Sequence, residues 1–176
     1  LDEGKPVLLD LFATWCGPCW SFAETGVFEE FDALYGPNGD NSAFTISIEA
    51  DPSTPESEFY GGGSSVGDWT SMITHHMADD ASGSIADAYA LAYYPTIYLI
   101  CPDRTVTEIG QSGGDFTYWT VETLFEEVFV NTCPAPVEGS NAIIQSYNAE
   151  LVSCGDVVIE PIVTILNMGT EDMTAC

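Results

Sequence analysis

The sequence predicts an α/β fold with a central mixed sheet flanked by helices. The run 7–13 is apolar except for Asp10, which suits a strand buried on both faces, as the strands of parallel sheets are. Residues 43–49, AFTISIE, alternate in character and include β-branched side chains, as a second strand would. Between the two, apolar residues of 20–35 recur at near-helical spacing with acids between them. These three observations favour the α/β class.

Two cysteines follow the first strand as Cys16-Gly17-Pro18-Cys19. If a helix starts there, Cys16 lies in its first turn, where unpaired backbone N–H groups and the positive end of the helix dipole favour a thiolate. Cys19 then lies one turn deeper. This spacing provides a nucleophilic thiol and a resolving thiol, and Cys-x-x-Cys beside a strand-helix pattern indicates a redox motif.

Residues 15–19, WCGPC, resemble the redox motif of thioredoxin. An acid, Asp10, stands six residues before Cys16, and the pair Pro95-Thr96 precedes a later strand, which strengthens the resemblance. It implies a thioredoxin-like domain over residues 1–132 with Asp10 buried beneath the cysteines. An acid inside an apolar run calls for such a reason; a polar residue at a strand end is the alternative.

The resemblance also assigns residues around Pro95. Ser84 can cap a short helix at 85–92, which leads into the apolar strand 97–101. Thioredoxin-like folds place a cis proline ahead of this strand, facing the cysteines, so Pro95 is expected to have that role, although most X-Pro bonds are trans. The residues expected to shield the site or to receive an extended substrate segment are Trp15, Gly17, Pro18, Tyr94 and Thr96.

Residues 53–82 depart from a minimal thioredoxin. They contain three consecutive glycines, scattered acids, Trp69 and the pair His75-His76, with little periodicity, and we interpret them as a long surface insertion. The insertion either shapes partner binding or is a spacer. An edge strand at 106–110 and an amphipathic closing helix at 116–130 complete the expected fold.

From Cys133 the character of the sequence changes. Residues 133–141 are expected to be a linker, and short strands are expected at 142–147 and 157–167. Because 157–174 resembles the opening of an immunoglobulin-like sandwich, we interpret 142–176 as an incomplete Ig-like segment. Two or three strands bury too little apolar surface to form the core of a sandwich. Either the chain is cut at Cys176 or neighbouring protein adds strands, for example by self-association.

Several segments together, among them the stretches GKPVLLDLFATWCGPCW and YYPTIYLICPDR, resemble secreted thioredoxin-like proteins of Bacteroidetes. The resemblance implies further β-sandwich modules and a C-terminal type IX secretion signal. It also implies a secreted or cell-surface location, with the periplasm as second choice. No signal peptide is evident and the chain begins at Leu1 rather than Met, so we interpret it as a processed product or a fragment.

The composition is acidic but globular. There are 28 acidic residues and 2 basic ones, a formal charge of −26, yet hydrophobic residues make up 45% of the chain. Nucleic acid and anionic membrane surfaces are therefore excluded as partners, since the long-range field repels them. No 18-residue apolar run predicts a membrane span. A saline extracellular setting would screen the self-repulsion.

The cysteine count exceeds what one redox pair needs. Besides Cys16 and Cys19, four remain, Cys101, Cys133, Cys154 and Cys176, and an even surplus favours an oxidising compartment. In the thioredoxin-like topology the strand 97–101 and the closing helix end at the same pole, which pairs Cys101 with Cys133 and leaves Cys154 for Cys176. The alternative is that Cys101 is a buried small hydrophobe.

The expected chemistry is thiol-disulfide exchange with protein thiols or disulfides, and no cofactor besides the Cys16–Cys19 disulfide. Cys16 thiolate attacks a partner disulfide, Cys19 resolves the mixed disulfide, and Asp10, with a pKa raised by desolvation, takes or relays the Cys19 proton. The direction of exchange is left open. The alternative is a thioredoxin-like scaffold or binding module of a self-associating or multi-module extracellular protein.

Metal binding is a third hypothesis. Carboxylates that could ligate Ca²⁺ occur at Asp51, Glu56, Glu58 and Asp79-Asp80, without EF-hand spacing. His75-His76 with Asp79 could hold a transition metal, but solvated loop histidines are the favoured interpretation. Zinc at Cys16 and Cys19 lacks a second ligand pair, and covalent haem is excluded because no His follows the Cys-x-x-Cys.

Overall fold

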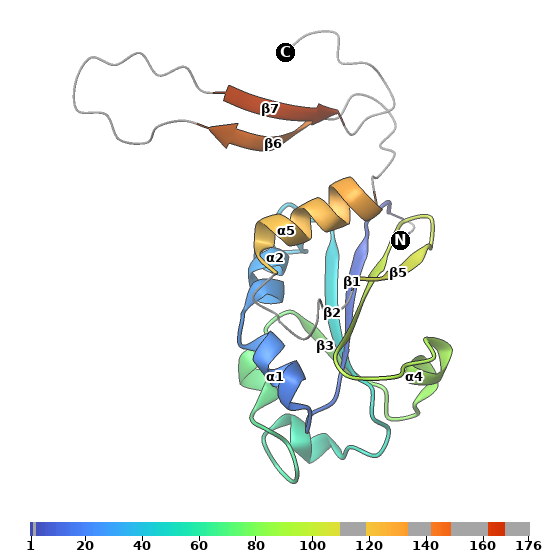
Figure 1. Ribbon diagram of the computed structural model, residues 1–176. Coiled ribbons are helices and arrows are strands. Elements are labelled where there is room, and N and C mark those ends of the chain that lie inside the picture. The colour runs from blue at the N-terminus through green and yellow to red at the C-terminus, as the bar shows by residue number, and fades with distance from the viewer. Residues whose placement is uncertain (2, 110–118, 134–141, 149–161, 168–176) are drawn as a thin grey trace, which may run out of the picture. The chain divides into compact units, whose positions relative to one another are not determined.

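The computed structural model describes residues 1, 3–109, 119–133, 142–148 and 162–167, the last two ranges as backbone only (Figure 1). Contacts divide the chain into two compact units, Leu1–Cys133 and Pro134–Cys176. Each unit is described by itself below.

The first unit is built on a five-stranded mixed sheet with the strand order β3-β2-β1-β4-β5. The central strand β1 (Val7–Phe12) runs parallel to β2 (Phe44–Glu49) and antiparallel to β4 (Thr96–Ile100). The edges are β3 (His76–Asp79), parallel to β2, and β5 (Val106–Glu108), antiparallel to β4. The α/β class with a mixed sheet is thus confirmed.

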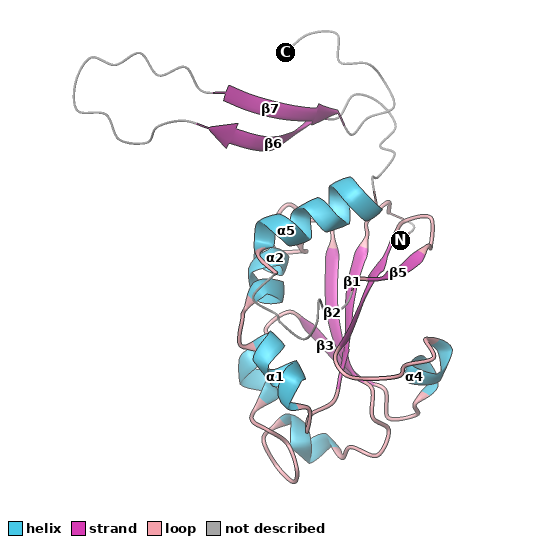
Figure 2. Ribbon diagram, viewed as in Figure 1, coloured by secondary structure: helices cyan, strands magenta, loops and turns pink. Residues whose placement is uncertain are grey.

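Helices cover both faces of this sheet (Figures 1 and 2). One face carries α1 (Gly17–Ala23), α2 (Val27–Tyr35) and α5 (Val121–Phe125), which continues as a π-helical segment, Glu126–Thr132. Phe31 of α2 stacks on Phe129 with ring centroids 6.3 Å apart. The opposite face carries α4 (Ser84–Ala88), which packs on the side chains of β1 that point away from α1.

The single helix expected at 20–35 is wrong. Two helices form because Gly26 has a φ of 67°, in the left-handed region that ends α1 and starts α2. The Thr25 hydroxyl donates to the Phe22 carbonyl at 2.6 Å and accepts from the Val27 N–H at 3.3 Å. These two contacts make a tight corner. The helical spacing of apolar residues continues across this corner, so the sequence pattern does not reveal that the helix is interrupted.

The interpretation of residues 53–82 as a surface insertion is also corrected. The segment contains a 3₁₀ turn at Glu56–Phe59, the short helix α3 (Trp69–Met72) and the edge strand β3. Trp69 is 1% exposed; its ring lies 4.6 Å from that of Phe12, and its Nε1–H donates to the Thr14 carbonyl at 3.0 Å. Elements of four residues are too short to show a period, so only their burial identifies them as core.

Other expected boundaries shift. The helix expected at 85–92 is α4, and its N-cap is Gly83 rather than Ser84. The closing helix begins at Val121 after the cap Thr120, while residues 116–118 lie outside the described chain.

In the second unit, β6 (Ala142–Asn148) and β7 (Ile162–Asn167) form an antiparallel pair. The linker segment 134–141 lies outside the described residues, as do 149–161 and 168–176, with Cys154 and Cys176 among them. An Ig-like sandwich therefore stays a prediction.

Candidate active site

The two cysteines of the Cys-x-x-Cys segment are joined at the start of α1. Cys16 is the N-cap residue, and its Sγ accepts the backbone N–H of Cys19 at 3.1 Å. The Cα atoms of the disulfide lie 5.3 Å apart. Both side chains are buried, whereas Gly17 and Pro18 between them are exposed. When the pair is reduced, the N–H that Cys19 donates favours the thiolate form of Cys16.

A groove of about 650 Å³ opens beside Cys16. Trp15, which is 45% exposed, lies along it and is held by its Nε1–H, which donates to Asp51 Oδ2 at 2.8 Å. The Trp15 ring meets the Tyr94 ring edge-on at 5.7 Å. Residues expected from the sequence supply much of the lining, namely Trp15, Cys16, Gly17, Pro18 and Tyr94. The far wall is new and comes from α4 and the segment after it, including Ala86, Asp87, Leu91 and Ala92.

Pro95 follows Tyr94 through a cis peptide bond. The Tyr94 hydroxyl donates to the Ala50 carbonyl at 3.0 Å, which holds this ring at the groove. Thr96 is 2% exposed, and its hydroxyl donates to the Tyr93 carbonyl at 2.7 Å. Neither Pro95 nor Thr96 is among the residues that line the groove, and their expected role toward a substrate stays a prediction.

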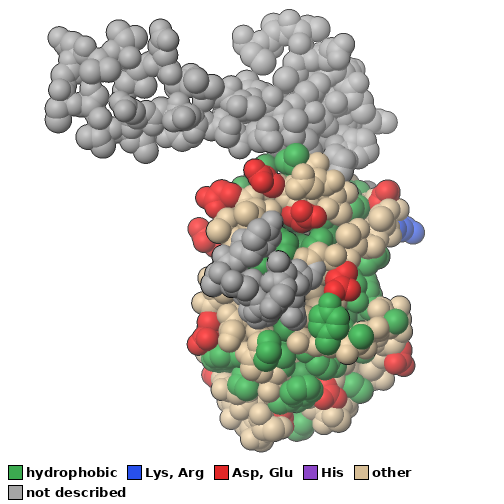
Figure 3. Space-filling view, viewed as in Figure 1, with side chains coloured by type: hydrophobic (Ala, Val, Ile, Leu, Met, Phe, Trp, Pro, Cys, Tyr) green, Lys and Arg blue, Asp and Glu red, His purple; other side chains and the backbone are tan. Residues whose placement is uncertain are grey.

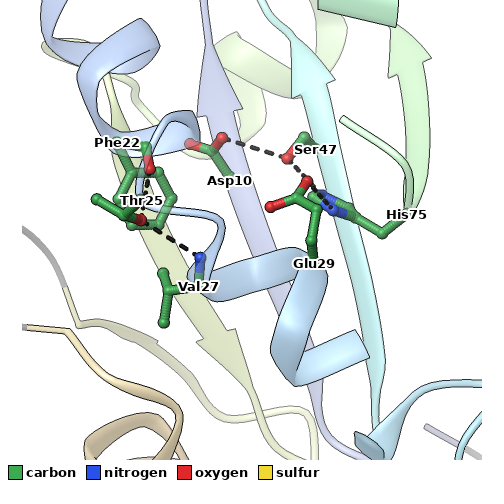
Figure 4. A network of polar contacts seen from close by, with 7 residues as sticks. All are labelled: Asp10, Phe22, Thr25, Val27, Glu29, Ser47 and His75. Atoms are coloured by element: carbon green, nitrogen blue, oxygen red, sulfur yellow. Dashed lines mark hydrogen bonds and ion pairs between the residues drawn. The ribbon is translucent and has the colours of Figure 1, made fainter. Parts of the chain in front are cut away.

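Asp10 lies in the middle of β1 and is 5% exposed. Its Oδ2 accepts from the Ser47 hydroxyl at 3.3 Å, and the same Ser47 Oγ lies 2.9 Å from His75 Nε2 (Figure 4). His75 Nδ1 in turn lies 2.9 Å from Glu29 Oε1. Burial raises the pKa of Asp10 to about 7, against the opposing effects of the His75 charge and the Ser47 hydrogen bond.

The interpretation of His75 as a solvated loop histidine is wrong, because its side chain is 2% exposed. The register of β3 decides this: His76 begins the strand and is exposed, with its ring against Phe44, while His75 turns toward Ser47. Nothing local distinguishes two adjacent histidines. The sequence did carry a signal for Ser47, because it alternates with Ile46 and Ile48 and so lies on the other face of the strand. In the structure it pairs in register with Asp10.

A second acid, Glu49, is fully buried on β2, where it pairs with Phe12 of β1. Burial raises the pKa of Glu49 to about 7. It alternates with Ile48 in the same way that Ser47 does, so Ser47 and Glu49 share the sheet face of Asp10. Two acids with raised pKa values therefore lie beneath the helix that carries the cysteines.

No protein-family model matches the chain. It is 30% identical over 111 residues to thiol-disulfide oxidoreductase ResA of Oceanobacillus iheyensis, a match that covers 62% of this chain and 50% of that protein. It is 41% identical over 54 residues to a thioredoxin of Mycolicibacterium smegmatis, covering 31% of this chain and 46% of the thioredoxin. The chain thus spans about half the length of these relatives.

A solved structure repeats the architecture. The thioredoxin domain of a thiol-disulfide oxidoreductase from Bacteroides vulgatus aligns with a TM-score of 0.50 and 14% identity, covering 72% of this chain and 81% of that one. At this identity the likeness shows the fold alone. The fold is thioredoxin-like.

The thioredoxin-like unit holds a second disulfide. Cys101 follows β4 and Cys133 follows the π-helical segment, and the two are bonded with Cα atoms 5.2 Å apart. This bridge ties the end of the closing helix to the sheet.

Two of the carboxylates considered for calcium, Glu58 and Asp80, have other partners in the thioredoxin-like unit. Glu58 accepts from the Thr14 hydroxyl at 2.9 Å and from the Ser64 N–H at 3.0 Å. Asp80 accepts from the Ile85 and Ala86 N–H groups at the start of α4. In the described part of the chain, no three His, Cys, Asp or Glu side chains gather as a metal site.

Proposed function

We propose that this protein is a thiol-disulfide oxidoreductase that exchanges disulfides with other proteins through Cys16 and Cys19. One observation carries the proposal: the Cys16–Cys19 disulfide caps α1 at the edge of a groove, with Cys16 Sγ accepting a backbone N–H. A purely structural disulfide would have no need of that groove.

The mechanism follows from this geometry. Cys16 thiolate attacks one sulfur of a substrate disulfide, forming a mixed disulfide and releasing the other sulfur as a thiolate. Cys19 loses its proton to Asp10 and attacks Cys16 Sγ, which restores the Cys16–Cys19 bond and releases the second substrate thiol. Two electrons pass from the protein dithiol to the substrate, and the reverse sequence oxidises a substrate dithiol. A Gly-Pro pair between the cysteines supports the reducing direction by similarity to thioredoxin.

The groove supports an extended peptide as substrate. Its two sides come from segments far apart in the sequence, Trp15 to Pro18 on one and α4 with the following residues to Tyr94 on the other. Aromatic and small side chains line most of it, and Asp87 is its acidic member. Such a groove beside Cys16 can accept an extended chain that carries a cysteine.

We propose a secreted or cell-surface location. The Cys101–Cys133 disulfide supports an oxidising compartment. Acidic side chains are spread over the visible face of the first unit rather than gathered in one patch (Figure 3), as a screened, saline setting would tolerate. Among the described residues, no helix is both long and apolar enough to cross a membrane.

A scaffold or binding role is the second candidate, and the β6–β7 pair favours it. Two antiparallel strands alone are marginal in water, so strands added from another copy or another module would stabilise them. The similarity of 157–174 to the opening of an Ig-like sandwich, and of the chain to type IX secreted proteins, supports this arrangement.

The decisive experiment is catalysed reduction of a model protein disulfide, together with the redox potential of the pair in glutathione buffers. We expect a two-electron transition and turnover, loss of turnover in Cys16→Ser, and a trapped mixed disulfide in Cys19→Ser. The double variant Cys101→Ala/Cys133→Ala is the matched control and should keep turnover. If the Cys16–Cys19 pair is reduced and oxidised in the buffers but does not accelerate disulfide exchange, the oxidoreductase proposal is wrong and the scaffold role is favoured.

A further inference from the structure

A line of polar groups leads from Asp10 to the surface. Asp10 is 5% exposed, the His75 side chain 2% and the Glu29 side chain 20%. Ser47 Oγ bridges the first two, at 3.3 Å from Asp10 Oδ2 and 2.9 Å from His75 Nε2, and His75 Nδ1 lies 2.9 Å from Glu29 Oε1 (Figure 4). Only Glu29, the last residue of the line, is partly exposed. The line therefore has a buried end at Asp10 and an end near solvent at Glu29.

Four separate elements set this line. The parallel register of β1 and β2 places Ser47 opposite Asp10, and His75 directly precedes β3, which pairs with β2. The corner made by Thr25 and Gly26 starts α2 at Val27, which puts Glu29 in its first turn. Figure 4 shows Asp10, Ser47, His75 and Glu29 converging from these elements.

The buried end borders α1, the helix that carries the resolving cysteine. A cavity of about 10 Å³, room for about one water molecule, is lined by Asp10, Ser47, His75 and Glu29 and walled by apolar residues, among them Phe22 and Ala23 of α1. Phe22 and Ala23 follow Cys19 by three and four residues and so share its helix face. The Asp10 Oδ1 atom is buried and has no hydrogen-bond partner in the protein, which leaves it free to take a proton.

We propose that Ser47, His75 and Glu29 form the exit by which the Asp10 proton reaches solvent during thiol exchange. The proposal rests on the proposed function and assigns His75 and Ser47 as positioning and relay residues rather than residues that touch the reacting sulfurs. Two buried polar side chains and a partly exposed one, from three elements, would otherwise have to be aligned at a cost to stability and without a task.

The proton balance is simple. Cys19 S–H gives its proton to Asp10 as the Cys19 thiolate attacks Cys16 Sγ. The Asp10 carboxyl then donates to Ser47 Oγ while the Ser47 hydroxyl proton passes to His75 Nε2. His75 Nδ1 and Glu29 Oε1 lie 2.9 Å apart without a hydrogen bond between them, so a small rotation must align them before His75 releases its Nδ1 proton to Glu29. The Glu29 side chain, which is 20% exposed, then gives the proton to water. One proton leaves, no electrons move along the line, and the reverse path returns a proton when the disulfide is reduced.

The electrostatics agree with this path. The titratable groups that face Asp10 are His75, from the segment before β3, and Glu29, from α2. Burial raises the pKa of Asp10, the His75 charge and the Ser47 hydrogen bond lower it, and Glu29 raises it slightly. Loss of His75 or Ser47 should therefore raise the pKa of Asp10 further and slow its deprotonation.

The test compares His75→Gln with His76→Gln, its exposed neighbour, and Ser47→Ala with Ser47→Thr. Gln keeps a polar partner for Ser47 but does not gain and release a proton as an imidazole does, and Thr keeps the hydroxyl. The readout is the single-turnover rate of mixed-disulfide resolution across pH, in H₂O and D₂O. We expect H75Q and S47A to slow resolution by about tenfold or more, to move the pH midpoint upward and to change the solvent isotope effect. H76Q and S47T should match the wild type.

The outcomes separate the two proposals. If the wild type itself does not exchange disulfides, the proposed function fails. If the wild type exchanges and H75Q and S47A resolve within twofold of it, with the same pH midpoint, the relay is wrong and the function stands. A rate loss with an unchanged midpoint and isotope effect also overturns the relay, because a packing defect would produce it. If H75Q does not fold, the Ser47 pair decides alone.

Discussion

At the scale of single residues, burial of Asp10 in the sheet carries a desolvation cost. An acid within a strand whose neighbours Leu9 and Leu11 pack into the core must lose most of its hydration when it is charged. The hydrogen bond that it accepts from Ser47 is long, at 3.3 Å. This cost is consistent with the proposed function, in which Asp10 takes the Cys19 proton, and not with a role in stabilising the sheet.

Asp10→Asn should therefore stabilise the protein at high pH. Folding raises the Asp10 pKa from 3.8 to about 7, so between those values the folded state holds a proton that the unfolded chain has released. Wild-type stability then falls as pH rises from about 4 to about 7 and is level above that. Relative to the wild type, D10N should gain roughly 4 kcal/mol between pH 4 and pH 8. Urea unfolding of the oxidised proteins at both pH values measures it.

Asp103 provides the control for that prediction. It is exposed, and the Thr105 N–H that it accepts holds its pKa below the usual range. Asp103→Asn should accordingly gain no stability relative to the wild type between pH 4 and pH 8. If D10N followed the wild type at every pH, the Asp10 carboxyl would not be desolvated in the folded state.

At the scale of elements, two glycine-containing segments adjoin α1, the helix that begins at the cysteines: the segment after β2 and the corner between α1 and α2. The segment after β2 is tied to the end of β1 through Glu58, whose carboxylate accepts from Thr14 and from the Ser64 N–H and hydroxyl. Gly63 lies against this carboxylate: a Cβ there would be 2.4 Å from Glu58 Oε1. At Gly26, the corner between α1 and α2, a Cβ would meet nothing within 4 Å.

This contrast predicts that Gly63→Ala destabilises more than Gly26→Ala. Both glycines have positive φ, 59° and 67°, so each substitution costs roughly 1 to 2 kcal/mol for the left-handed backbone. Gly63→Ala must in addition displace the buried Glu58 carboxylate, which adds on the order of 1 to 3 kcal/mol. Urea unfolding of both variants tests this. Equal losses would mean that the Glu58 carboxylate moves freely.

At the scale of the whole molecule, the Cys101–Cys133 bridge stabilises the first unit by closing a long loop. The two residues are 32 apart in sequence, so the double variant Cys101→Ala/Cys133→Ala should lose about 4 kcal/mol by the loop-entropy estimate. The double variant of Cys16 and Cys19, separated by 3 residues, should lose about half as much by the same estimate. Unfolding under non-reducing conditions measures both losses. A larger loss in the Cys16/Cys19 variant than in the Cys101/Cys133 variant would contradict a structural role for the Cys101–Cys133 disulfide.

The charge of −26 predicts that salt stabilises the molecule. Repulsion among acids destabilises the compact state, and ions screen it. We expect the melting temperature to rise by roughly 2 to 8 °C between 10 mM and 0.5 M NaCl, which corresponds to about 1 to 2 kcal/mol. CaCl₂ at the same ionic strength is the control. A much larger rise in CaCl₂ would mean that calcium binds, and no rise in NaCl would contradict the repulsion.

The sequence by itself determined the features that local patterns encode. The apolar run of β1, the alternation of β2 and the Cys-x-x-Cys spacing predicted the α/β sheet and the dithiol, because burial and helix capping act over a few neighbouring residues. Asp10 was visible for the same reason, as an acid within an apolar run.

Tertiary structure alone decided what surrounds that acid. The four-residue strand β3 was too short to show a period, and only its pairing with β2 turns His75 inward and His76 outward. The corner at Gly26 depends on a backbone angle that apolar spacing does not reveal, and it is this corner that brings Glu29 to His75. The polar line from Asp10 joins residues 10, 29, 47 and 75. Contacts across such separations are set by strand register and packing, which no local pattern records.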